Sequence, residues 1–84
     1  MPVLSRFYGI IIRMYFQQKE HNPPHIHAIY GDSMAAVTIS DGKVLEGELP
    51  GKALEMVREW ISLHRDELLA IWETQDFRQL SPLE

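Results

Sequence analysis

The sequence contains no cysteine, which excludes a disulfide framework and a zinc site built on thiolates. Its longest strongly apolar run, Ile10-Ile11-Ile12, is far shorter than the roughly 20 residues that a membrane-spanning helix needs. Gly42 is followed by Lys43 and then by Val44 rather than by serine or threonine, and Gly47 is followed by Glu48, so neither fits the end of a phosphate-binding loop. The stretch from Met1 to Arg6 lacks a basic start followed by an apolar run, so a cytoplasmic location is expected.

Positive charge is scarce as well. The sequence has eight Lys and Arg residues and twelve Asp and Glu residues, which gives a net charge of −4. Residues 1–43 carry four basic and three acidic side chains, whereas residues 44–84 carry four basic and nine acidic ones. The second half would therefore repel a phosphate backbone. This distribution disfavours nucleic-acid binding, and with it a role as a transcription-associated regulator.

The length of 84 residues predicts a single domain, residues 1–84, with a small margin of stability. No disulfide is available to reinforce so small a core, which favours association with a partner. The tail, residues 76–84, contains Pro82 and has no periodic pattern. We expect it to be loosely ordered.

Alternating apolar residues predict four strands, after a short lead-in over residues 1–8. The expected strands are residues 10–17, 25–30, 34–40 and 43–49. The side chains expected in the core are Ile10, Ile12, Met14, Phe16, Ile26, Ala28, Tyr30, Val37 and Ile39.

Asp41-Gly42 is a favoured pair for a two-residue hairpin turn between the last two strands. A strict turn of this kind places Ile39 opposite Val44, but it also places Val37 opposite Glu46. The sequence leaves a bulged turn open as an alternative.

A helix is predicted over residues 52–74, since apolar side chains recur there at helical spacing. Its expected buried stripe consists of Ala53, Leu54, Val57, Trp60, Ile61, His64, Leu68, Ile71 and Trp72. At ~1.5 Å per residue this helix is longer than the strands. It must overhang the sheet, bend near residues 64–66, or pack on a second molecule. Leu63 and Leu69 lie off the stripe and favour an external contact.

The strands and the helix together predict the fold class α+β: a four-stranded antiparallel meander with one long C-terminal helix packed on one face.

The chemical character of the chain is concentrated in His21-Asn22-Pro23-Pro24-His25-Ile26-His27-Ala28. His25 and His27 are two residues apart on a strand, so they share one face, expected to be the face away from the helix. With His21 from the preceding loop they form a candidate site for a divalent metal such as zinc. The alternative, which the sequence favours, is that these histidines fix the turn or contact a partner.

Arg13 and Tyr15 would share that face with His25 and His27 if the first two strands pair. Arginine, tyrosine and histidine on one sheet face are typical of a phosphate-binding surface, and histidine can act as a general acid or base. These four residues are the catalytic candidates of a small ribonuclease-like enzyme. His64, within the helical stripe, is expected to be a buried, hydrogen-bonded histidine rather than a ligand.

Several stretches together resemble a known family of small bacterial proteins. They are Ser5-Arg6-Phe7-Tyr8-Gly9-Ile10, Met14-Tyr15-Phe16, the histidine-rich stretch through Gly31, Val44-Leu45-Glu46-Gly47, Leu49-Pro50, and the segments 58–60 and 64–68. The chain is similar, over nearly its whole length, to the domain-of-unknown-function family numbered 4160. The resemblance implies an unassigned function and a gene beside that of another small domain, as in toxin–antitoxin pairs. It implies no catalytic or metal-binding residue.

Three functions follow in order of preference. The first is an interaction module of a toxin–antitoxin-like two-gene pair, whose partner is the product of the neighbouring gene, a second copy of the chain, or both. The second is a small metal- or phosphate-handling enzyme that uses the histidine-rich stretch. The third is the transcription-associated regulator that the charge disfavours.

Overall fold

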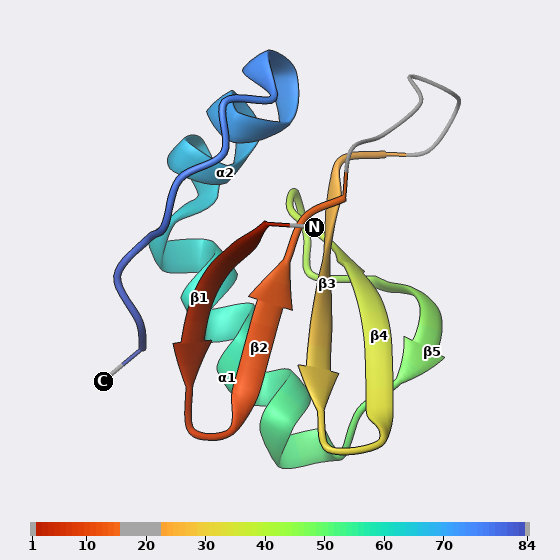
Figure 1. Cartoon of the computed structure of the whole chain (residues 1–84). Coiled ribbons are helices and arrows are strands. Elements are labelled where there is room, and N and C mark those ends of the chain that lie inside the picture. The colour runs from red at the N-terminus through yellow and green to blue at the C-terminus, as the bar shows by residue number, and fades with distance from the viewer. Residues whose placement is uncertain (1, 16–22, 84) are drawn as a thin grey trace.

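The computed structural model describes residues 2–15 and 23–83. Its centre is an antiparallel sheet of five strands in the order β1-β2-β3-β4-β5. The strands are β1 (Val3–Phe7), β2 (Ile10–Arg13), β3 (His25–Tyr30), β4 (Ser33–Thr38) and β5 (Val44–Glu48). Figure 1 looks onto one face of this meander, with helix α1 behind it. The α+β class and the antiparallel sheet are confirmed, but the prediction of four strands is wrong.

The additional strand is β1, which lies where the sequence predicted only a lead-in. Phe7 pairs with Ile10, so Tyr8 and Gly9 alone form the turn, with φ angles of 49° and 81°. Positive φ at both central residues is the geometry that suits a tight hairpin. A register shift between Val3 and Ser5 marks a bulge, which interrupts the alternation that would have identified the strand.

The hairpin between β4 and β5 contains the bulge that the sequence left open. Val37 pairs with Val44 and Ala36 with Glu46, with a register shift between the two pairs. The strict two-residue turn is therefore wrong. At the end of β4, the Thr38 hydroxyl donates to Asp41 and accepts from the Lys43 amide at 2.9 Å. The bulge keeps Val37 buried and leaves Glu46 exposed.

Two helices replace the single long helix that was expected over residues 52–74. They are α1 (Gly51–Leu63) and α2 (Arg65–Thr74), and His64 between them has φ −118° and ψ 20°. Of the three alternatives drawn from the helix length, the bend near residues 64–66 is the one observed. None of the helices in the described residues is long and apolar enough to cross a membrane.

One face of the sheet packs against the apolar stripe of the helices. The predicted core side chains Ile10, Ile12, Met14, Ile26, Ala28, Val37 and Ile39 are fully buried there, with Val57, Trp60, Ile61 and Leu68 from the helices. Tyr30 was expected in this core but is 40% exposed, because it ends β3 beside the turn at Gly31. Phe16, also predicted to be buried, lies outside the described residues.

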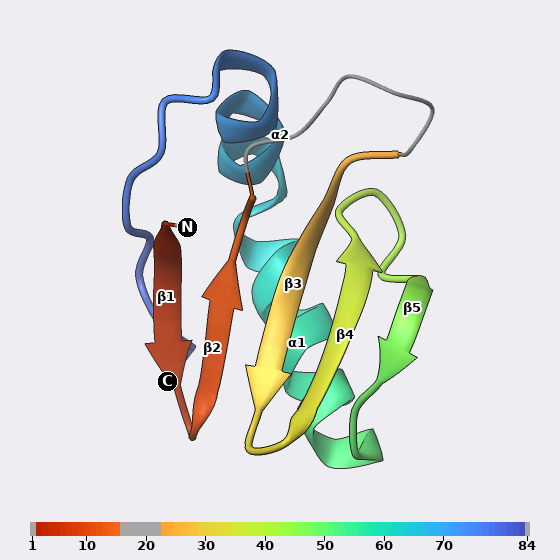
Figure 2. The ribbon, with the colours of Figure 1, turned by 45° about the vertical axis from the view of Figure 1, so that its right-hand side comes forward.

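The C-terminal segment runs beside β1 in both Figure 1 and Figure 2 rather than forming the loosely ordered tail that was expected. Leu80 and Leu83 are buried in the core cluster. The Leu80 amide donates to the Leu4 carbonyl at 2.7 Å, and Trp60 Nε1 donates to the Ser81 carbonyl at 2.8 Å. The segment therefore covers part of the outer edge of β1.

Candidate functional site

The face of the sheet opposite α1 carries most of the side chains that the sequence singled out. We call it the open face; its residues, set by cross-strand register, are Val3, Arg6, Ile11, Arg13, His25, His27, Ile29, Met34, Ala36, Thr38, Glu46 and Glu48. Alternation along β3 buries Ile26 and Ala28 in the core and directs His27 and Ile29 to this face. Among the described residues, no helix crosses its centre in Figure 1.

One level of the open face is a continuous row across all five strands. Arg6 pairs with Ile11, Ile11 with Ile29, Ile29 with Met34, and Met34 with Glu48. This Arg6 row begins with a basic side chain, ends with an acidic one, and is apolar between them. Ile11 and Ile29 are half-buried, and Met34 is 40% exposed.

A second level, nearer the start of β3, repeats this order of charge. Arg13 pairs with His27, His27 with Ala36, and Ala36 with Glu46. The small Ala36 side chain lies between His27 and Glu46, and their charges interact across it. Arg13 also pairs with Val3 of β1, so in this Arg13 row the basic side chain lies on β2, next to β1, and the acidic end lies on β5.

Around His27 lies a cluster of rings from three parts of the chain. The centroid of the His27 ring is 4.3 Å from that of Tyr15 and 5.2 Å from that of His25. The His25 ring in turn lies 5.1 Å from Trp72 of α2, and His25 Nδ1 donates to the Pro23 carbonyl at 2.9 Å. The structure thus brings together Tyr15, His25 and His27, with Arg13 directly opposite His27.

The electrostatic state of His27 follows from this setting. Burial lowers the pKa of His27, the positive charge of a protonated His25 lowers it further, and Glu46 acts in the opposite direction. His27 Nδ1 is buried and has no hydrogen-bond partner in the described part of the chain. Because the pKa lies below its ordinary value, a neutral imidazole is favoured at pH 7.

The proposed metal ligands are brought together only in part. His25 and His27 are neighbours, whereas His21 lies outside the described residues. Within residues 2–15 and 23–83, no three His, Cys, Asp or Glu side chains are grouped so that they could hold a metal ion. A pair of imidazoles is fewer than the three protein ligands of a typical catalytic zinc site.

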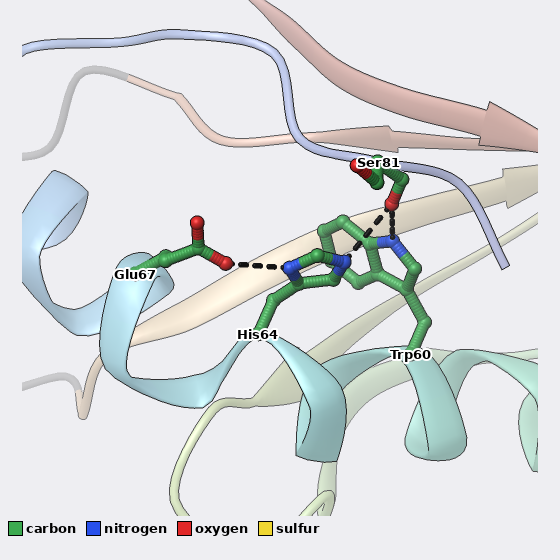
Figure 3. Close-up of polar contacts among 4 residues, drawn as sticks. All are labelled: Trp60, His64, Glu67 and Ser81. Carbon is green, nitrogen blue, oxygen red and sulfur yellow. Dashed lines mark hydrogen bonds and ion pairs between the residues drawn. The ribbon is translucent and has the colours of Figure 1, made fainter.

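His64 is placed apart from this face, at the junction of α1 and α2. Figure 3 shows its ring between Glu67 and the C-terminal segment. Its Nδ1 lies 2.6 Å from a Glu67 carboxylate oxygen, and its Nε2 lies 3.0 Å from the Ser81 carbonyl that also accepts from Trp60. His64 is therefore a hydrogen-bonded residue that joins the helix break to the tail.

The open-face residues that were not predicted as site residues include Arg6, Met34 and Glu48. Arg6 was missed because β1 was taken as a lead-in, and the pairing of Glu48 with Met34 was missed because it depends on the bulged register of β4 and β5. The pair Tyr8-Gly9 between two apolar stretches was the signal that could have identified β1.

Comparisons with curated proteins and with solved structures gave no match. A family model described as a domain of unknown function (DUF4160) matches residues 9–73. This range includes β2 to β5, α1, the histidine-rich stretch and all but the last residue of α2. The chain therefore belongs to the DUF4160 family.

Proposed function

We propose that this chain is a small interaction module of a toxin–antitoxin-like two-gene pair, and that another protein chain covers the open face of its sheet. The observation that carries the proposal is the Arg6 row: half-buried Ile11 and Ile29 and exposed Met34 lie between charged borders. The opposite face is already covered by α1, and the C-terminal segment covers part of the β1 edge.

The composition of the open face supports a protein partner. Protein interfaces combine an apolar centre with a polar rim, and methionine and arginine are enriched in them. Here the apolar centre consists of Ile11, Ile29 and Met34, and the rim consists of Arg6 on one side and Glu48 on the other. A contiguous apolar patch with a polar rim is typical of a protein interaction site.

A test of this proposal replaces Met34, the most exposed apolar side chain of the row. The chain is co-expressed with the product of the neighbouring gene, and capture is compared between the wild type and Met34→Asp. A buried, unpaired carboxylate at an interface is costly, so capture of the partner should fall by about tenfold or more, which is ~1.4 kcal/mol or more.

Ala70→Asp is the matched control, because Ala70 is exposed on α2 and lies off the open face. Circular dichroism should show that both variants keep the fold. Equal capture of the wild type and Met34→Asp would remove the open face as the binding surface.

A second candidate function is a phosphate-handling or metal-assisted enzyme at Arg13, Tyr15, His25 and His27. The observation in its favour is that Tyr15 and His25 flank the His27 ring, with Arg13 opposite. Inorganic phosphate and Zn²⁺, added separately, should then shift the imidazole NMR signals of the wild type. In the metal version, zinc binding should weaken in His25→Ala/His27→Ala and in His21→Ala. Unchanged signals with both additives would count against this alternative.

A further inference from the structure

The distribution of charge on the open face identifies its occupant. We propose that a second copy of this chain covers it, in a face-to-face dimer whose two-fold axis runs nearly parallel to the strands and passes over β3. The inference rests on the proposed function, since it names the protein chain that covers the same surface.

The Arg6 row is complementary to itself about such an axis. The rotation places β1 of one copy over β5 of the other, and β2 over β4, at the same level along the strands. Arg6 then meets the partner's Glu48, Ile11 meets the partner's Met34, and Ile29 meets its own counterpart. Each contact occurs twice, as in every isologous interface.

The same charges exclude the other simple arrangement. An axis parallel to the sheet but perpendicular to the strands places β1 over β1 and β5 over β5. Arg6 and Arg13 would then lie near their own counterparts, and so would Glu46 and Glu48. Like charges facing each other across an interface cost several kcal/mol, so the order of charge selects the axis parallel to the strands. Sheets packed in this way keep their strand directions within about 30°.

The size of the face sets the strength of the association. Five strands about 4.8 Å apart and roughly 17 Å long cover about 400 Å². Two such faces bury roughly 800 Å², less than the ~1,200–2,000 Å² of stable interfaces. We therefore expect a dimer that forms at tens to hundreds of micromolar protein and dissociates on dilution.

The test reverses the charges at the two ends of the Arg6 row. Sedimentation velocity is recorded over a wide concentration range for the wild type, Arg6→Glu, Glu48→Arg and the double variant. Each single change places like charges together at both symmetric contacts, so the dimer dissociation constant should rise by about tenfold or more. The double variant exchanges both partners and should return to within about threefold of the wild type.

Mixing the two single variants provides a further test. The glutamate introduced at position 6 of one variant meets the arginine introduced at position 48 of the other, and the native Glu48 meets the native Arg6. A mixture should therefore form a heterodimer that neither variant matches alone. Glu59→Arg is the control for a change of charge, because Glu59 is exposed on α1, on the opposite side of the sheet from the open face.

Three results would overturn the inference. They are a wild type that stays at 9.8 kDa up to hundreds of micromolar, a dimer that the single variants leave unchanged, and a double variant that does not recover. If the chain remains a monomer but Met34→Asp abolishes capture of the neighbouring gene product, the proposed function stands and only the identity of the occupant is wrong. If Met34→Asp affects neither association, both are wrong.

Discussion

His27 links the open face to the pH dependence of folding. Burial lowers its pKa in the folded state from the ordinary 6.5, so the unfolded chain binds this proton more readily. The contribution of His27 to stability is therefore complete above about pH 6.5 and declines as the pH falls toward its folded pKa. The charge of His25 beside it makes the charged form of the ring still less favourable, whereas Glu46 acts in the opposite direction.

The corresponding prediction is that His27→Gln reduces the loss of stability between pH 7 and pH 5. Urea denaturation at several pH values measures this. His25→Gln, which leaves His27 in place, should retain most of the decline, because burial is the largest cause of the His27 shift. An equal pH dependence in the wild type and His27→Gln would show that His27 is not the group responsible.

At the scale of single elements, α1 is held by one large side chain. Trp60 is fully buried, its ring centroid lies 5.8 Å from that of Phe7, and its Nε1 donates to the Ser81 carbonyl. Trp60→Ala should lower the free energy of unfolding by about 3–5 kcal/mol, and Ile61→Ala by at least ~2 kcal/mol. Thermal melts provide the measurement. Glu59→Ala, an exposed neighbour, should be nearly silent, and comparable damage from it would contradict the observed phase of the helix.

The C-terminal segment is the second element that a measurement can test. Leu80 is buried, and its amide donates to the Leu4 carbonyl. Leu80→Ala should cost about 2 kcal/mol, at the lower end of the range for buried leucines, because the site lies near the surface. Gln79→Ala is the control, since Gln79 is exposed. Equal stability of the two variants in urea denaturation would indicate the loosely ordered tail that the sequence suggested.

The elements that the sequence predicted correctly are those whose pattern is local. The period of two in β2 and β3 identified Ile10, Ile12, Ile26 and Ala28 as core residues, and all four are fully buried. β1 was not predicted as a strand, because its bulge buries the successive residues Leu4 and Ser5. Two buried residues in a row interrupt the alternation of buried and exposed side chains by which a strand is identified.

The helical periodicity of the apolar residues does not predict the break between α1 and α2. The apolar stripe continues through Leu68, Ile71 and Trp72, so it predicts one uninterrupted helix. The ring of His64, at the break, instead contacts Ser81, 17 residues later. A contact of that range leaves no mark in the local pattern.

The open face was predictable only in part: its local alternation could be predicted from the sequence, but its rows across the strands could not. Alternation is sufficient to place His25 and His27 on a common face. The two rows depend on register across five strands, including two bulges. Their residues are therefore known only from the structure, and the Arg6 row in particular joins side chains 42 positions apart in the sequence.

At the scale of the whole molecule, association and stability are linked. A dimer that forms only from folded chains shifts the folding equilibrium by mass action, so its melting temperature rises with protein concentration. A chain of this size unfolds with a small enthalpy, so a change of about 1 kcal/mol in the free energy of unfolding moves the melting temperature by ~4–8 °C.

We expect the wild type to melt several degrees higher at hundreds of micromolar than at a few micromolar. Arg6→Glu should melt at nearly the same temperature at both concentrations, because the glutamate introduced would face Glu48 across the interface. Calorimetry at the two concentrations makes the comparison. A wild-type melting temperature independent of concentration would mean that the open face does not bind a second copy in this range.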